Sequence, residues 1–281
     1  MLIGVVGLGL IGGSLAKAIK YNTENTVLGY DIDLNVLLKA KLLGAVDGEL
    51  TEDKIPECDM IITGLYPQST KDFINANAAK FKKGAIVVDT CGVKGYVCED
   101  MWKTAKENGF VFIGAHPMAG LHYSGFEHSQ VTLFNNASMV LVPSKDVNIN
   151  DLEKVKKLFL SIGFTDIQLT TPEKHDKLIA FTSQLAHVVS NAYVKSPTAK
   201  EHKGFSAGSY KDLTRVAKLN ETMWTELFLE NDEYLIREID GIIENLQQYS
   251  AALKARDEKA LRQLLKDGRE CKERIDGEYN D

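Results

Sequence analysis

The sequence contains few cysteines, and their spacing indicates neither a metal site nor a disulfide framework. Cys58, Cys91, Cys98 and Cys271 are the only four among 281 residues. They include no Cys-x-x-Cys pair, and no Cys/His pair has zinc-finger spacing. We therefore expect free thiols in a reducing compartment, and no bound metal.

Long hydrophobic runs and blocks of like charge are also absent. No uninterrupted apolar stretch approaches the length of a membrane-spanning helix, and the apolar N-terminus is interrupted by Gly4, Gly7 and Gly9. The net charge is −6, and the lysines and arginines are scattered along the chain. We therefore expect a cytoplasmic protein that binds neither a membrane nor nucleic acid.

Up to residue 171, short apolar runs alternate with amphipathic stretches. The predicted strands are Leu2–Val6, Thr26–Tyr30, Met60–Thr63, Ala85–Val88, Phe110–Ile113, Met139–Val142 and Ile167–Leu169. The predicted helices are Ile11–Lys20, Leu34–Leu43, Pro67–Phe81, Val97–Glu107 and Asp151–Leu160. This alternation indicates βαβ units, and hence an α/β fold of the Rossmann type with a mostly parallel sheet.

From residue 172 onward the pattern is helical only. Thr171 and Pro172 form a typical helix start, and apolar residues then recur at helical spacing. The stretches concerned are Leu178–Val194, Leu213–Leu219, Trp224–Ile243 and Ala251–Leu265. We therefore predict two domains, 1–171 and 172–281. Long amphipathic helices seldom bury all their apolar surface alone, so the second domain is expected to form a homodimer.

A glycine-rich turn, Gly-Leu-Gly-Leu-Ile-Gly at residues 7–12, lies between the first predicted strand and helix. This is the Gly-x-Gly-x-x-Gly pattern in the context that dinucleotide binding requires. Gly7 permits a tight turn, Gly9 lets the backbone approach a pyrophosphate, and Gly12 lets the helix pack against the strand. N–H groups at the helix start then face the phosphates. The residues expected to bind the cofactor here are Gly7, Gly9, Leu10, Ile11 and Gly12.

Asp31 ends the second predicted strand, at the place where an acid binds the ribose hydroxyls of a dinucleotide. A carboxylate there would repel the 2′-phosphate of NADP, so we predict NAD as the cofactor. A glycine-rich turn near a helix-capping aspartate is the simpler alternative. The strand, turn, helix, second strand and acid nevertheless occur in the order that the dinucleotide site requires.

His116 opens the sequence His-Pro-Met-Ala-Gly shortly after the predicted strand Phe110–Ile113. Ligands of open parallel sheets bind at the carboxyl ends of the strands. Pro117 restricts the backbone and Gly120 allows a turn, so we expect a rigid loop that holds the imidazole there. Histidine can accept a proton near neutral pH. A loop histidine packed on the rim of the sheet is the alternative, and position alone does not decide between them.

A second candidate segment runs from Gly204 to Arg215. A loop of glycine and serine leads into a predicted helix, on which Lys211 and Arg215 stand four residues apart and share one face. The planar guanidinium of arginine suits a substrate carboxylate. A solvated charged face with Asp212 as partner would explain the same pattern.

Together these segments resemble the prephenate dehydrogenase family. The resemblance rests on residues 5–14, 89–94, 116–125, 206–217 and 223–231, which follow in the family's order along nearly the whole chain. It implies a nucleotide-binding domain followed by a helical dimerisation domain. It also implies oxidative decarboxylation of prephenate to 4-hydroxyphenylpyruvate, with hydride transfer to NAD, in tyrosine biosynthesis.

The resemblance further implies roles for single residues. His116 would bond the C4 hydroxyl of the substrate and take its proton, and Arg215 would bind a substrate carboxylate. The lesser substrate contacts that it implies are Lys211, His187, Trp224 and Ser124. Many members carry a serine where this chain has Gly92, so water, Thr90, Cys91 or Ser124 would have to replace its hydroxyl. His175 and Asp176 match a family dipeptide, to which we assign no role.

Three alternatives stay open. Arogenate dehydrogenase performs the same chemistry on a substrate with an amino-acid side chain, and nothing in the sequence fixes which side chain is accepted. A dehydrogenase of 3-hydroxy acids would need a catalytic lysine; Lys94 and Lys195 are available, but the contexts of His116 and Arg215 fit that chemistry poorly. A regulatory dimer that binds NAD without turnover is favoured by Gly92 alone.

Overall fold

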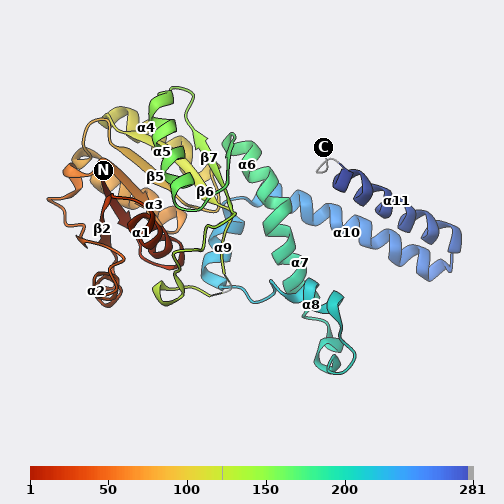
Figure 1. Ribbon diagram of the computed structural model, residues 1–281. Coiled ribbons are helices and arrows are strands. Elements are labelled where there is room, and N and C mark those ends of the chain that lie inside the picture. Colours follow the sequence, from red (N-terminus) through yellow and green to blue (C-terminus); the bar gives the residue numbers. More distant parts are fainter. Residues whose placement is uncertain (122, 278–281) are drawn as a thin grey trace. The chain divides into compact units, whose positions relative to one another are not determined.

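The computed structural model describes residues 1–121 and 123–277 (Figure 1). The chain divides into two compact units, Met1–Asp232 and the residues from Glu233 on. Residues 278–281, which end the predicted second domain, lie outside the described part. The division into domains 1–171 and 172–281 stays a prediction.

Eight strands form one sheet in the order β3-β2-β1-β4-β5-β6-β7-β8. The strands are β1 (Leu2–Val6), β2 (Thr26–Tyr30), β3 (Gly48–Glu49), β4 (Met60–Thr63), β5 (Ile86–Asp89), β6 (Val111–Pro117), β7 (Ser138–Pro143) and β8 (Asp166–Leu169). Every neighbouring pair is parallel except β6 and β7. The predicted α/β fold with a mostly parallel sheet is confirmed, and the strand order reverses at β1 and β4, where such sheets bind ligands.

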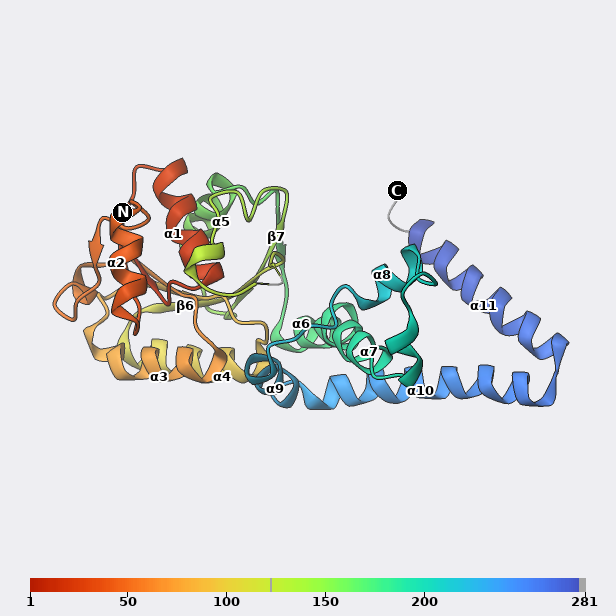
Figure 2. The ribbon, with the colours of Figure 1, turned by 90° about the horizontal axis from the view of Figure 1, so that it is seen from below.

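Helices cover both faces of the sheet (Figure 2). One face carries α1 (Leu10–Asn22), α2 (Leu34–Leu42) and α5 (Ile149–Ser161), and the other carries α3 (Pro67–Asn77) and α4 (Gly95–Asn108). Successive side chains of a strand point to opposite faces. In β4, for example, Met60 and Ile62 belong to the core cluster under α1, and Ile61 belongs to the cluster under α3 and α4. Strands buried on both faces are continuously apolar, which made the central ones recognisable in the sequence.

Strand β6 is longer than the predicted strand Phe110–Ile113. It continues to Pro117, and His116 pairs with Val140 of the antiparallel neighbour β7. The prediction of a loop that holds His116 was therefore wrong: the ladder with β7 keeps the backbone extended past the end of the parallel pairing with β5. Strand β3, which has only two residues, was missed.

Residues 172–193 form one continuous helix, with α6 (Pro172–Ile179), a π-helical segment (Ala180–Leu185) and α7 (Ala186–Tyr193). The remaining helices are α8 (Gly208–Thr214), α9 (Glu221–Leu229), α10 (Asp232–Ala255) and α11 (Glu258–Gly277). As predicted, no strand follows residue 171 in the part of the chain that the structure describes. Within residues 1–121 and 123–277, no helix combines the length and the apolar character needed to cross a membrane.

Three of the predicted helical stretches are not continuous helices. The stretch Trp224–Ile243 is divided between α9, which ends at Leu229, and α10, which begins at Asp232. The predicted helix Leu213–Leu219 is wrong because α8 ends at Thr214, and Asn220 then accepts a hydrogen bond from the N–H of Met223 (3.0 Å) at the start of α9. The predicted helix Ala251–Leu265 is broken before α11, where the Asp257 carboxylate accepts the N–H of Ala260 (2.9 Å). Asparagine and aspartate side chains favour such caps over helix interiors.

Candidate active site

The glycine-rich turn joins β1 to α1 and depends on glycine at two points. Gly7 has φ +82°, and its N–H donates to the carbonyl of Tyr30 (2.8 Å). A Cβ at position 12 would lie 1.8 Å from the Gly7 carbonyl oxygen, so only glycine fits there. A Cβ on Gly9 would meet nothing within 4 Å. The open side of Gly9 is the space that a closely approaching pyrophosphate would use.

The start of α1 and the end of β2 complete this cofactor region. Helix α1 begins at Leu10, and no side chain caps it. The backbone N–H groups of Leu10 and Ile11 are therefore available to an anion. The Asp31 carboxylate accepts the N–H of Leu8 (2.7 Å) and the N–H of Asp33 (2.9 Å). These two bonds hold the carboxylate beside the turn. The region therefore fits the phosphates and a ribose of a dinucleotide.

His116 is the first member of a hydrogen-bonded chain that crosses from the sheet to the helices. Its Nδ1 lies 2.9 Å from Nε2 of His175, and His175 Nδ1 lies 2.6 Å from Oδ1 of Asp176. The Asp176 carboxylate also accepts the backbone N–H of Lys94 (2.8 Å) and of Gly95 (2.7 Å), at the start of α4. His175 and Asp176 are buried, so the chain is held between β6, α4 and α6.

The partners in this chain determine which nitrogen of His116 carries a hydrogen. A carboxylate only accepts, so Nδ1 of His175 is the donor to Asp176 and Nε2 of neutral His175 is an acceptor. Nδ1 of His116 must then donate to that acceptor. The assignment follows from the network, and it leaves Nε2 of neutral His116 with a lone pair that can take a proton.

A buried ion pair fixes the backbone beside His116. Lys94 and Asp89 are fully buried and paired with each other. The Lys94 ammonium also donates to the carbonyl of Ala115 (2.7 Å), while Asp89 accepts the N–H groups of Ala115 (3.0 Å) and Cys91 (2.9 Å). Lys94 is therefore committed to holding β5, β6 and the start of α4 together, and it places a positive charge behind the imidazole.

This environment keeps the His116 imidazole neutral. Burial, and then the positive charges of a protonated His175 and of Lys94, hold the pKa of His116 well below its usual value. Burial also lowers the pKa of His175, against the opposing effect of its hydrogen bond to Asp176. Both rings are therefore neutral near pH 7, and His116 can serve as a proton acceptor.

Gly92 and Leu227 lie in front of His116. A Cβ at position 92 would stand 4.0 Å from His116 Nε2 and 3.2 Å from the Leu227 side chain. Leu227, on α9, therefore packs against the place where a side chain at position 92 would begin. The backbone of Gly92 therefore lies close to Nε2 of His116, and the apolar Leu227 packs beside Gly92.

Two of the residues proposed to replace the missing hydroxyl are engaged elsewhere. Thr90 donates its hydroxyl to the carbonyl of Thr63 (2.9 Å), and the Cys91 thiol is within hydrogen-bonding distance of Thr70 Oγ1 (3.4 Å). Both side chains are buried. Ser124 is exposed in the loop after β6 and does not belong to the His116 hydrogen-bonded chain.

His187 and Trp224, which were predicted to contact the substrate, lie against each other, with ring centroids 4.0 Å apart and the ring planes inclined by 31°. Trp224 and Leu227 are three residues apart on α9 and therefore neighbours on its surface. His187 Nδ1 lies 2.9 Å from the carbonyl oxygen of Ser183, so that nitrogen is the donor. The α9 helix thus connects the position in front of His116 with the ring of His187.

Lys211 and Arg215 are both exposed. Lys211 lies on α8, and Arg215 is the first residue after that helix, which ends at Thr214. Within the described part of the chain, neither forms an ion pair with Asp212 or with another acid. The segment after α8 is attached to α7 through Asn191, whose amide donates to the carbonyl of Ala217 (3.1 Å).

His175 and Asp176 are the site residues to which the sequence analysis gave no role. Their dipeptide was recognised, but helical histidines are more often structural, and no local pattern shows that His175 reaches a residue 59 positions earlier. The sequence places His175 on a helix but does not show which element that helix packs against, so its contact with β6 could not be predicted.

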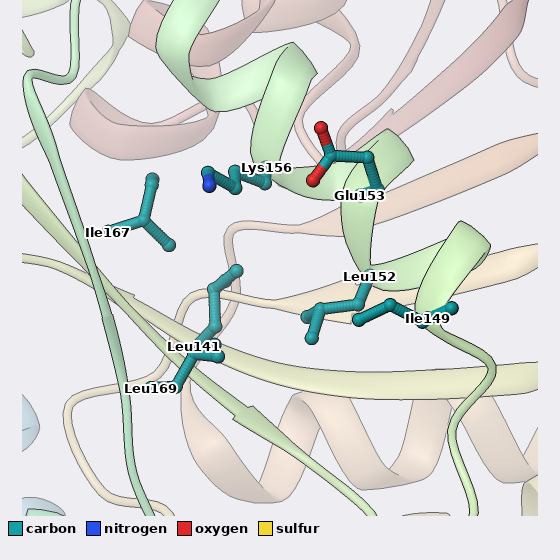
Figure 3. A pocket seen from close by; sticks show the side chains of 7 residues that line it. All are labelled: Leu141, Ile149, Leu152, Glu153, Lys156, Ile167 and Leu169. Atoms are coloured by element: carbon teal, nitrogen blue, oxygen red, sulfur yellow. The ribbon is translucent and has the colours of Figure 1, made fainter.

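Among residues 1–121 and 123–277, no group of three or more His, Cys, Asp or Glu side chains is placed to hold a metal ion. Figure 3 shows a pocket between α5 and the strands β7 and β8. It is lined by Leu141, Ile149, Leu152, Glu153, Lys156, Ile167 and Leu169. It contains no residue of the His116 chain.

Comparison with known proteins agrees with this arrangement. The family model for the prephenate dehydrogenase nucleotide-binding domain matches residues 15–167, and that for the prephenate dehydrogenase dimerization domain matches residues 171–267. Prephenate dehydrogenase of Lactococcus lactis is 29% identical over 280 residues, which cover 97% of this chain and 77% of that protein.

Solved structures show the same similarity over the full length. Prephenate dehydrogenase of A. aeolicus, in complex with hydroxyphenyl propionate and NAD+, has a TM-score of 0.86 and 28% identity, with 98% of each chain covered. Arogenate dehydrogenase of Synechocystis has a TM-score of 0.81 and 25% identity, with 98% of this chain and 100% of that chain covered. The two family models together match most of the sequence, and this chain therefore belongs to the prephenate dehydrogenase family.

Proposed function

We propose that this protein is an NAD-dependent prephenate dehydrogenase, which oxidises and decarboxylates prephenate to 4-hydroxyphenylpyruvate in tyrosine biosynthesis. The chain from Asp176 through His175 to His116 is the observation that carries the proposal, because it presents one neutral nitrogen as a proton acceptor. The similarity to prephenate dehydrogenases supplies the substrate. Such an enzyme would work in the cytoplasm.

NAD would be held by the turn at residues 7–12 and by Asp31, and when bound it accepts the hydride. Gly9 leaves room for the pyrophosphate, and the uncapped N–H groups of Leu10 and Ile11 favour its negative charge. The Asp31 carboxylate would accept hydrogen bonds from the ribose hydroxyls and repel a 2′-phosphate. The cofactor therefore carries the redox chemistry, and the chain supplies position and proton transfer.

His116 would take the proton of the C4 hydroxyl of prephenate on Nε2. The C4–H bond breaks with hydride transfer, the oxygen becomes a carbonyl, and the proton ends on the imidazole. The bond from the ring to its carboxylate then breaks, CO2 leaves, and its electron pair completes the aromatic ring, whose oxygen takes up the proton from His116. Aromatisation makes this step essentially irreversible.

The two substrate carboxylates need cationic or donor partners. We assign Arg215 to one of them, with Lys211, His187 and Ser124 as lesser contacts and Trp224 as a wall of the pocket. Arg215 suits this role because its guanidinium can bind a carboxylate through two parallel hydrogen bonds, and it is exposed without an acidic partner in the described residues.

Arogenate dehydrogenase is the second candidate, favoured by the similarity to the Synechocystis enzyme of that name. Arogenate has the same ring, hydroxyl and ring carboxylate, so the same proton acceptor would serve. Only the side-chain end of the pocket would distinguish the two substrates.

Steady-state assays test the proposal directly. Prephenate and NAD should give reduced cofactor, followed by absorbance, and His116→Asn should lower kcat/KM about 1,000-fold without changing NADH affinity. His128→Asn alters a partly exposed histidine that does not belong to the hydrogen-bonded series Asp176–His175–His116, and it should retain activity. Turnover of arogenate alone would change the substrate and keep the mechanism. Binding of NADH without turnover of either acid would contradict the proposal.

A homodimer is the second part of the proposal, supported by an apolar stripe on α10. Ile236, Ile243, Leu246 and Leu253 are each at least 45% exposed and follow a 7-3-7 spacing, which is typical of a helix seam. Light scattering should give the mass of two chains. Leu246→Glu should produce the monomer, and Gln248→Glu, on the opposite face of α10, should not. A monomer mass for the unaltered protein at micromolar concentration would contradict this assembly.

A further inference from the structure

The helix that carries His175 also carries His187, and a π-helical segment separates them. His175 and His187 are 12 residues apart, and in a regular α-helix 12 residues turn through about 1,200°, which leaves the two side chains about 120° apart around the axis. The π-helical segment Ala180–Leu185 accommodates one extra residue in the helix. Eleven effective steps turn through about 1,100°, so His187 lies only about 20° from His175. The segment therefore brings both rings to one face.

A buried amide pair holds this segment at both ends. The Asn231 side chain donates to the carbonyl of Asp176 (2.9 Å), before the segment, and to Oε1 of Gln184 (2.7 Å), within it. The Gln184 amide in turn donates to the carbonyl of Leu227 (2.9 Å). Gln184 is 1% exposed and Asn231 is 4% exposed. The same clasp thus joins the π-helical segment to α9 at the residue that packs beside Gly92.

Side chains also bond the carbonyls of the widened helix. Thr182 donates its hydroxyl to the carbonyl of Leu178 (2.8 Å), and His187 donates from Nδ1 to the carbonyl of Ser183 (2.9 Å). The orientation of the His187 ring therefore depends directly on a carbonyl of the π-helical segment. The contact with the Trp224 ring restricts the His187 ring further.

We propose that the π-helical segment places His187 in the substrate site, and that Gln184 and Asn231 are the positioning residues that hold it there. This inference rests on the proposed function and deepens it, because it explains how two histidines of one helix can serve one substrate: His175 orients the proton acceptor, and His187 faces the substrate from the α9 side. π-Helical turns inside α-helices occur frequently at functional sites.

Loss of the clasp tests the geometry without any assay of turnover. In Gln184→Met, which removes the clasp at similar side-chain volume, the segment can relax to a regular helix of the same residue count, and this would rotate His187 by about 100° away from Trp224. In a Trp102→Phe background Trp224 is the sole tryptophan, and acrylamide quenching measures how far His187 covers it. Gln184→Met should raise the quenching constant to the value of His187→Ala. Deletion of the exposed Thr182 from the Gln184→Met protein leaves eleven regular steps between His175 and His187, so it should restore the original constant, whereas Thr182→Ala in the same protein should not.

Kinetics then test whether this placement serves the substrate. Gln184→Met should lower kcat/KM for prephenate by roughly tenfold to 100-fold, mainly through KM, while the affinity for NADH stays unchanged. Deletion of Thr182 from that protein should recover most of the loss. His187→Ala should cost about tenfold in the unaltered protein and less than about twofold in the Gln184→Met background. Asn231→Leu, which removes the other member of the clasp, replaces Gln184→Met if that variant does not fold.

The outcomes separate this inference from the proposed function. An equal loss on His187→Ala in both backgrounds, or quenching unaffected by Gln184→Met and by Asn231→Leu, would overturn the positioning role. Absence of prephenate turnover in the unaltered protein would remove the proposed function instead, and the quenching experiment would still decide whether the π-helical segment sets the position of His187.

Discussion

The cofactor turn and the His116 chain are built in opposite ways. The turn occupies residues 7–12, with Asp31 at the end of the adjacent strand. It depends on the backbone, because Gly7 has a positive φ and a Cβ would collide at both Gly7 and Gly12. The His116 chain joins segments that are distant in sequence, and it depends on side chains. One added methyl group can disrupt the backbone of the turn. The hydrogen-bonded side chains of His116, His175 and Asp176 are disrupted when one of them loses its hydrogen-bond donor or acceptor.

Gly12→Ala should have the largest effect on the cofactor side of this comparison. The added methyl group would lie 1.8 Å from the Gly7 carbonyl, so the turn must open, and NADH affinity should fall by at least about 100-fold together with the thermal midpoint. Fluorescence titration with NADH and a melting curve measure both quantities.

Gly9→Ala is the matched variant, because a Cβ there meets nothing within 4 Å. It should keep the melting temperature and still weaken NADH, by about tenfold, since only the bound pyrophosphate needs that space. Equal destabilisation by the two variants would show that the open side of Gly9 has no role in cofactor binding.

His175→Asn should lower kcat by about 100-fold while leaving NADH affinity unchanged. The variant removes the acceptor that fixes a hydrogen on Nδ1 of His116, so the reactive nitrogen is no longer defined. The pH profile provides a second readout. A proton acceptor loses activity as the pH falls through its pKa, and a charged His175 is one cause of the low pKa of His116. The acid limb of kcat/KM should therefore move to higher pH in the variant; an unmoved limb would contradict the coupling.

The same contrast explains what the sequence could reveal. The strand, glycine-rich turn and helix at residues 2–22 could be predicted because their signals are neighbours along the chain, and their role in binding NAD stays a proposal. His116 was found, but its loop was wrong, because the ladder between His116 and Val140 needs a strand that lies more than 20 residues away. The contact with His175 left no local signal, and neither did the π-helical segment, which is defined by backbone hydrogen bonds and held by Asn231 from the turn between α9 and α10.

Asp31→Ser should have an intermediate effect that is confined to the cofactor. Removing the carboxylate loses its bonds to the N–H of Leu8 and to the ribose, so NAD should bind about tenfold more weakly. Repulsion of a 2′-phosphate is lost as well, so the preference for NAD over NADP should narrow. Measuring kcat/KM for both cofactors tests this, with Asp33→Ser as the control because Asp33 caps α2 instead. An unchanged preference would mean that another group excludes NADP.

Glu230→Gln should have the smallest effect, and it concerns the stability of the assembled region. Burial, and then the negative charge of Glu226, raise the pKa of Glu230 to about 8, and its Oε2 is buried without a hydrogen-bond partner in the described residues. In the unfolded chain a glutamate titrates near about 4.3. The folded state therefore binds the extra proton between these values, so this contribution to stability is complete below about pH 4.3 and is lost as the pH rises through about 8.

Glutamine imitates the protonated form, so Glu230→Gln should match the unaltered protein at pH 5 and exceed it at pH 9. The gain should be on the order of 1 kcal/mol, far below the full shift, because the side chain is partly exposed and solvent screens its charge. Urea unfolding at the two pH values measures the difference, with Glu244→Gln on the exposed side of α10 as the control. An equal gain at both pH values would mean that the amide forms a new contact and that the charge of Glu230 is not the cause. A gain at pH 9 alone would show that ionisation of Glu230 lowers the free energy of unfolding at alkaline pH. The glycine-rich turn at residues 7–12 contains no such carboxyl group.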